Sequence, residues 1–155
     1  MIQNRSELAT TSRRRTVLDL VETGIGAVLP ERVMQSALSY DPESGLLSVC
    51  GESYDVSSGR IFVVGGGKAA ACMAEALEGI IPPDHIAAGI VNCRHGSAGL
   101  RGIQVREAGS PLPDERGVEG VRDMLSLKDR YGITEDDLVL SLISGGGSAL
   151  LPSPA

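Results

Sequence analysis

Hydrophobic residues recur with a helical period in the first forty residues of the chain. Six of them share one face of a predicted helix: Val17, Leu18, Val21, Ile25, Val28 and Leu29. Pro30 cannot continue the hydrogen-bond ladder of that helix, so we expect a helix pair over 6–29 and 31–39. Two short runs at 46–50 and 53–56, joined by Gly51 and Glu52, then predict a small β-hairpin.

The pattern changes after residue 60, where strands and helices alternate. The continuous apolar run at 61–64 is typical of a strand covered on both faces. Residues 88–91 and 138–143 predict further strands, and 103–107 alternates like another one. A helix-forming, Ala-rich segment at 68–77 and an amphipathic one at 115–131 separate these strands. This order predicts an α/β, Rossmann-like fold with a mostly parallel sheet and helices on both faces, preceded by the helix pair and the hairpin.

Length and charge limit the classes of protein that fit. The chain has 155 residues, of which 42% are hydrophobic, and a formal net charge of −6. This size suits one domain with one core. The chain has one Phe, three Tyr and no Trp, so it lacks a basic face with stacking rings and we expect no nucleic-acid partner. No apolar run is long enough to span a membrane, so we expect no membrane partner either.

The three cysteines do not indicate a disulfide framework or a zinc site. Cys50, Cys72 and Cys93 are widely spaced and form no CxxC pair. Cys93 and His95 together would supply two metal ligands at most, so we expect no metal site. The sequence therefore predicts free thiols in a reducing cytoplasm.

An arginine-rich segment near the start shares one feature with export signals. Residues 12–18 loosely resemble a twin-arginine motif. Asp19 and Glu22, however, interrupt the apolar stretch that should follow such a motif. We therefore expect this segment to belong to the first helix and the chain to be cytoplasmic.

A glycine-rich turn follows the first predicted strand of the main sheet. Its residues are Gly65, Gly66 and Gly67, and Lys68 follows them directly. Backbone N–H groups at a strand-to-helix turn can converge on an oxyanion, and a lysine in the first helical turn opposes the helix dipole unless an anion lies nearby. The segment is not a Walker A loop, because Ala69 replaces the magnesium-binding Ser or Thr. A phosphate-binding turn is one interpretation, and a tight-packing turn with a solvated lysine is the other.

A second such turn follows the last predicted strand. It consists of Ser144, Gly145, Gly146, Gly147 and Ser148. Successive glycines can form a nest of amides for a phosphate or carboxylate, although a flexible turn fits equally well. Because the carboxyl ends of parallel strands meet at one edge of a sheet, we expect both turns to lie at the same edge.

Charged residues in two loops are weaker candidates. Asp114 follows a rigid Pro-rich loop, where its carboxylate would bind a ligand hydroxyl or a metal–nucleotide complex, or would simply cap the next helix. Arg94, His95 and Arg101 would add positive charge near a ligand, or would form an ordinary solvated loop.

Together these motifs resemble the glycerate 2-kinase family whose second domain is called MOFRL. The resemblance is carried by VVGGGKAAACMA at 63–74, PLPDE at 111–115 and LISGGGSALLP at 142–152. It implies phosphoryl transfer from ATP to D-glycerate, giving 2-phosphoglycerate, with Mg²⁺ required. By this resemblance Lys68 is the active-site lysine, 144–148 form an anion-binding turn, and Asp114 lies on the rim of the cleft, while phosphate binding by Gly65, Gly66 and Gly67 is expected from the turn itself.

The same resemblance implies that residues 1–155 are the N-terminal portion of the large domain, without the MOFRL domain. The chain ends soon after its last predicted strand, so we expect an incomplete domain with little activity alone, which self-associates or is completed by a separately encoded C-terminal half. Ser110 stands where the family pattern has His, which affects any substrate contact made there.

Two other functions remain open at this point. One is a non-catalytic module that binds an anion or nucleotide, or that packs against a partner. The other is a nicotinamide-dependent hydroxypyruvate reductase. The absence of GxGxxG argues against the reductase, as does Asn92 at the strand end where a ribose-binding acid is expected.

Overall fold

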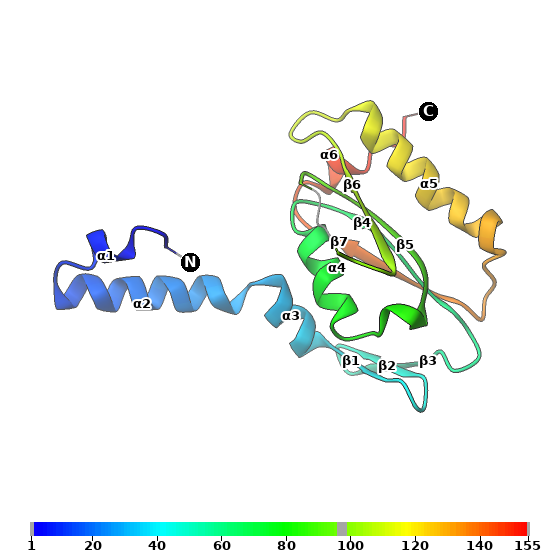
Figure 1. Ribbon diagram of the computed structural model, residues 1–155, viewed down its shortest axis with the longest axis horizontal. Helices are drawn as coiled ribbons and strands as arrows, with labels where there is room; N and C mark the ends of the chain where they lie inside the picture. The colour runs from blue at the N-terminus through cyan, green and yellow to red at the C-terminus, as the bar shows by residue number, and fades with distance from the viewer. Residues whose placement is uncertain (1, 96–98, 155) are drawn as a thin grey trace.

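The computed structural model describes residues 2–95 and 99–154 of the chain. Four parallel strands form its main sheet (Figure 1). Their order across the sheet is β6-β5-β4-β7, and their bounds are Ile61–Gly66 (β4), Ile86–Cys93 (β5), Ile103–Glu107 (β6) and Leu138–Ile143 (β7). The central strand β4 buries Ile61, Phe62 and Val63 on both faces, as expected for a parallel strand. The predicted fold class is confirmed.

Helices cover both faces of this sheet. Helix α4 (Ala70–Glu78) lies on one side and helix α5 (Glu115–Tyr131) on the other (Figure 1). Helix α4 buries Ala70, Ala74 and Leu77, since small side chains allow the helix to approach the sheet closely. Two shorter pieces complete this part, the 3-10 helix η1 (Pro83–His85) and helix α6 (Gly147–Leu150).

The N-terminal part differs in detail from the prediction. It contains three helices and a three-stranded antiparallel sheet, namely α1 (Arg5–Leu8), α2 (Ser12–Ala27), α3 (Pro30–Ala37), β1 (Leu38–Asp41), β2 (Leu46–Val49) and β3 (Glu52–Asp55). The expected helix over 6–29 is interrupted, because the hydroxyl of Thr11 caps α2 by accepting a hydrogen bond from Arg14 N at 3.3 Å. The expected hairpin gains β1, since Leu38 pairs with Val49 instead of continuing the helix.

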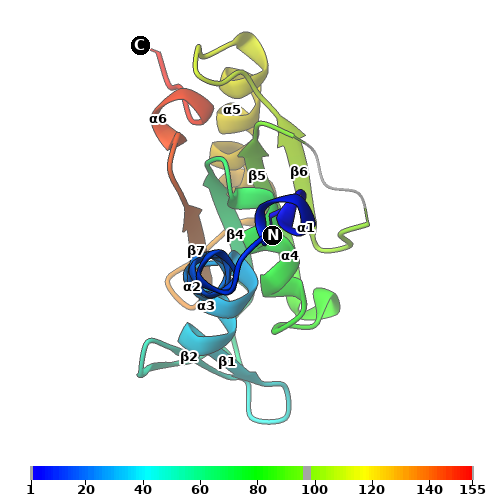
Figure 2. The same ribbon diagram turned by 90° about the vertical axis from the view of Figure 1, so that its left-hand side faces the viewer.

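Helix α2 does not bury its apolar stripe. It extends away from the rest of the chain (Figures 1 and 2), and none of its residues is buried. Val28, for example, is 71% exposed. Helix α1 folds back on α2 through ion pairs from Arg5 to Asp19 and Glu22. The sequence pattern thus correctly predicted a helix, but not what its apolar face packs against.

The small sheet is joined to the main core. Leu47 and Val56 are buried in the same cluster as Ile61, Leu77 and Ile81. The segment before β4 is held further by Arg60, whose guanidinium donates to the Asp137 carboxylate at 2.7 Å. Over the described residues, no helix is both long enough and apolar enough to cross a bilayer.

Candidate anion-binding site

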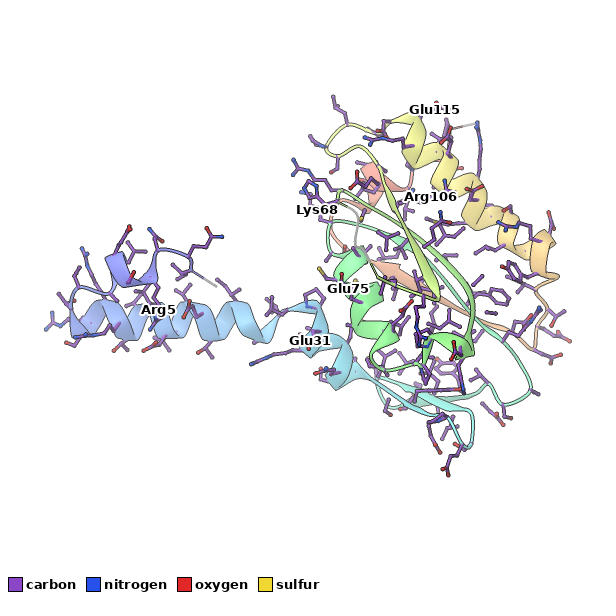
Figure 3. The ribbon with its side chains drawn as sticks, in the orientation of Figure 1. Arg5, Glu31, Lys68, Glu75, Arg106 and Glu115 are labelled. Carbon is purple, nitrogen blue, oxygen red and sulfur yellow. The ribbon has the colours of Figure 1, made fainter. Side chains whose placement is uncertain are left out.

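Both glycine turns leave the sheet at the same edge. Gly66 at the end of β4 pairs with Ile143 at the end of β7, and on its other side with Asn92 of β5. Figure 3 shows Lys68 at this edge, close to the start of α4. Segments far apart in the sequence therefore meet where a parallel α/β sheet binds its ligands.

Hydrogen bonds join the two turns directly. The amide of Lys68 donates to Gly145 O at 2.9 Å, and the amide of Ala69 donates to the Ser144 hydroxyl at 3.0 Å. In return, the amide of Ser144 donates to Gly66 O at 3.3 Å. The two turns are therefore one structural unit rather than two independent loops.

The amides of the first turn are largely used inside the protein. Besides the bonds of Lys68 and Ala69, the amide of Gly67 donates to Asn92 O at 3.1 Å. These three N–H groups do not point toward a ligand, so this turn chiefly supports its neighbour. Phosphate binding by Gly65, Gly66 and Gly67 stays a prediction, and the geometry shifts attention to the second turn.

Close approach of the two turns requires glycine at position 67. Its φ of 148° is one that residues with side chains rarely adopt. A Cβ atom there would lie 2.1 Å from the Ser144 hydroxyl oxygen. A larger residue would therefore separate the turns.

The second turn has donors to spare. Among the described residues, the amides of Gly145, Gly146 and Ser148 donate no hydrogen bond to the protein. Gly146 has a φ of 89°, and a Cβ atom on it would lie 3.2 Å from Lys68 Cγ and 3.3 Å from Lys68 Cε. The exposed Lys68 side chain thus runs along a turn whose amides are available to an anion.

The start of α4 corrects one part of the sequence interpretation. The helix begins at Ala70, not at Lys68. Lys68 precedes the helix because its amide binds Gly145 O in the second turn. Lys68 is therefore not in the first turn of the helix, where its charge would oppose the helix dipole, and it contacts the second glycine turn instead.

Asn92 is the residue of this edge that sequence reasoning assigned no role. Its side chain is fully buried, and its amide nitrogen donates to Gly117 O at 3.0 Å and to Leu150 O at 2.8 Å. Its own carbonyl accepts from Gly67. Asn92 therefore links the first turn, helix α5 and helix α6. A lone polar residue at the end of an apolar strand was the available signal.

Asp114 acts as the cap of α5. Its carboxylate accepts hydrogen bonds from Gly109 N at 2.9 Å and Gly117 N at 3.1 Å, and it pairs with Arg116 at 2.7 Å. The amide of Gly109, with Arg116 and Gly117, holds the pKa of this carboxyl below its usual value. The capping interpretation is confirmed, and a place for Asp114 on a cleft rim stays a prediction.

The cysteines differ in burial, since Cys93 is buried at the end of β5 while Cys50 and Cys72 are exposed. All three cysteines are free, and burial raises the pKa of the Cys93 thiol, which donates to His95 O. Arg94 and His95 are exposed. Within 2–95 and 99–154, no three Cys, His, Asp or Glu side chains gather as metal ligands.

Comparison with known proteins now places the chain. A family described as "Domain of unknown function (DUF4147)" matches residues 16–155. The chain is 39% identical to a glycerate kinase of Bos taurus over 87% of this chain. It is 36% identical to a glycerate 2-kinase of Pyrococcus horikoshii over 91% of this chain. A relative from Agrobacterium vitis, 40% identical over 79% of this chain and 27% of its own length, carries a provisional name as a hydroxypyruvate reductase.

Solved structures agree with these relatives. A crystal structure of a Pyrococcus horikoshii protein matches with a TM-score of 0.78 and 35% identity, over 94% of this chain and 32% of that one. The glycerate kinase of Thermotoga maritima matches with a TM-score of 0.67 and 30% identity, over 88% of this chain and 29% of that one. The chain spans only 28% and 30% of the Bos taurus and Pyrococcus horikoshii relatives.

Proposed function

The chain belongs to the glycerate 2-kinase family, and on that premise we propose that it supplies the phosphate-binding edge of an enzyme that transfers a phosphoryl group from ATP to D-glycerate, giving 2-phosphoglycerate. One observation carries the proposal. The Lys68 side chain lies along the second glycine turn, where three amides have no acceptor among the described residues.

Phosphoryl transfer needs this kind of arrangement. The reaction depends mainly on positioning and on neutralising negative charge over the phosphoryl oxygens. In the proposal, the amides of Gly145, Gly146 and Ser148 hold a phosphate or the substrate carboxylate, and the Lys68 amine neutralises its charge. The first turn contributes by fixing the second through the hydrogen bonds to Ser144 and Gly145.

The residues present fit ATP better than a protein-held magnesium ion. Mg²⁺ is commonly held by one or two carboxylates together with substrate phosphates. The described part of the chain offers no cluster of three acidic or other ligands, and the Asp114 carboxylate is already bound to two amides and Arg116. We therefore propose that Mg²⁺ arrives with the ATP phosphates, where it neutralises their charge.

We further propose that residues 1–155 correspond to the N-terminal portion of the family's large domain, with the MOFRL domain outside them. One edge of a cleft cannot enclose two substrates or exclude water, so this polypeptide alone is expected to show little kinase activity. A cytoplasmic location is proposed as well, because all three thiols are free.

Ligand binding tests the site apart from catalysis. Mg·ATP or inorganic phosphate should raise the melting temperature, by the equivalent of about 2.7 kcal/mol at a hundredfold excess over Kd. Lys68→Ala should abolish this shift, because the anion loses its counter-charge. Lys128→Ala is the matched control, since it removes the other lysine of the chain from an exposed position on α5. Equal shifts in both variants would remove Lys68 from the site.

Coupled assays distinguish the chemistry. Glycerate-dependent release of ADP, measured with the rest of a family enzyme supplied, supports the kinase. Oxidation of NADH by hydroxypyruvate would instead support the reductase suggested by the name of the Agrobacterium vitis relative. Ligand-induced stabilisation that depends on Lys68, with neither activity, would indicate a non-catalytic binding module.

A further inference from the structure

An apolar groove lies at the other face of the sheet from α4. Strand β7 turns alternate side chains to its two faces, and Val139 and Ile143 are 46% and 56% exposed. Helix α5 faces them with Val121 and with Leu125, which is 68% exposed. With Val64 of β4, these residues line a groove of about 430 Å³. A mainly apolar surface of this kind marks a place where another element packs.

The groove exists because α5 covers only part of its face. This helix packs mainly on β5 and β6. It covers Phe62 of β4 through Tyr131, but it leaves Val64 only half-buried and the outer side of β7 exposed. Strand β7 is also the edge of the sheet, since it pairs with β4 alone among the described strands. One face of β7 carries Leu138, Leu140 and Leu142, and the groove face carries Val139 and Ile143 with Ser141 between them, so both faces are mainly apolar. Such a pattern is typical of a strand that is covered twice.

The topology of the sheet determines what would cover this face. The crossover from β4 to β5 uses α4, and the crossover from β6 back to β7 uses α5 on the opposite face. Crossovers between parallel strands are right-handed. A strand added beyond β7 would therefore be reached through a helix on the α5 face, next to α5 and over β4 and β7. That position coincides with the groove.

The relatives contain chain that could supply such a helix. The Pyrococcus horikoshii and Thermotoga maritima structures match this chain over only 32% and 29% of their lengths. We infer that the groove is the docking site for one amphipathic helix from the part of the family chain that has no counterpart in residues 1–155. The docking helix should carry apolar residues at i, i+3, i+4 and i+7 that face the groove, and an acidic residue that pairs with Lys128 at the margin of the groove.

This inference concerns a surface away from the glycine turns and does not depend on kinase activity. Its test is co-expression of the 155-residue chain with the remaining chain of the Pyrococcus horikoshii relative, which allows the partner to fold on the groove. We expect the two to purify as a one-to-one complex by light scattering. Hydrogen exchange in β7 and in the middle of α5 should slow in the complex.

Leu125→Asp should weaken this complex by about tenfold or more, because a carboxylate would be buried without a partner. The side chain is exposed in the free chain, so the variant should fold normally. Val139→Asp repeats the test from the strand side, and Val28→Asp on the distant helix α2 is the matched control that should bind like wild type.

Three results would overturn the inference. One is failure of the two chains to co-purify. Another is a complex that Leu125→Asp and Val139→Asp leave intact. The third is a homodimer of the 155-residue chain that either substitution dissociates, since the occupant would then be a second copy.

Discussion

Asn92 should contribute more to stability than an exposed polar side chain does. The informative change is Asn92→Leu, which keeps the shape of the side chain but removes both hydrogen bonds to Gly117 O and Leu150 O. Each buried carbonyl left without a donor costs about 1–3 kcal/mol. Part of this loss is offset, because the Asn92 Oδ1 atom is itself buried without a partner among the described residues. We expect a net loss of about 1–3 kcal/mol.

Urea unfolding followed by circular dichroism measures this loss as a change in the free energy of unfolding, and thermal unfolding measures it as a change in melting temperature. For a chain of this size, 1 kcal/mol corresponds to a change in melting temperature of about 2–4 °C. Gln104→Leu is the matched control, since Gln104 is exposed on β6 and its replacement should change stability by no more than about 0.5 kcal/mol. Equal stability of Asn92→Leu and Gln104→Leu would refute the role given to Asn92.

Asn92→Asp makes the same argument through pH. An ionised carboxylate would face two carbonyl oxygens in a buried place, so its folded-state pKa should rise above the usual value of about 3.9. When the pKa of a group is higher in the folded than in the unfolded state, the folded protein is more stable with that group protonated than with it ionised. The variant should therefore lose stability as the pH increases above about 4, whereas Asn92→Leu should not. Parallel pH profiles of the two variants would contradict this reasoning.

Two further predictions concern stability. Gly120→Ala should destabilise by about 1–3 kcal/mol, because its Cβ would lie 2.0 Å from Asn92 Oδ1, whereas Gly24→Ala, with open space around it, should stabilise α2 by about 0.5–1 kcal/mol; thermal unfolding compares them. Hydrogen bonds from Arg60 lower the folded-state pKa of Asp137 below its ordinary 3.8, so its contribution is present above about pH 4 and is lost as the pH falls further. Asp137→Asn should flatten that acid-side loss in a pH series of melting temperatures.

The sequence pattern predicted the sheet and the place of the site because both depend on local signals. Buried parallel strands need runs of apolar residues, and the glycine turns at their carboxyl ends can be recognised directly in the sequence. The same logic could not predict that Lys68 precedes α4. That detail depends on a hydrogen bond to Gly145, a residue far along the chain. Strand β1 was missed for the same reason, since Leu38 becomes a strand residue only by pairing with Val49.

The division of work between the two turns was likewise hidden from the sequence. Both contain three glycines, and anion binding was an interpretation for each. Only the pairing of β4 with β7 brings them close enough for one to use its amides on the other. In the folded chain the backbone of the GGGK motif supports the second turn, and its lysine side chain lies along that turn.

Strand β7 connects the two surfaces proposed here. Its outer side chains Val139 and Ile143 line the groove, and its next residue, Ser144, begins the second turn. A helix packed on the groove would hold the end of β7 in place, and thereby Ser144 and the amides that follow it. Because such coupling is reciprocal, an anion on the turn would favour the docked helix as much as the helix favours the anion. The same strand would then make complete assembly and phosphate binding depend on each other.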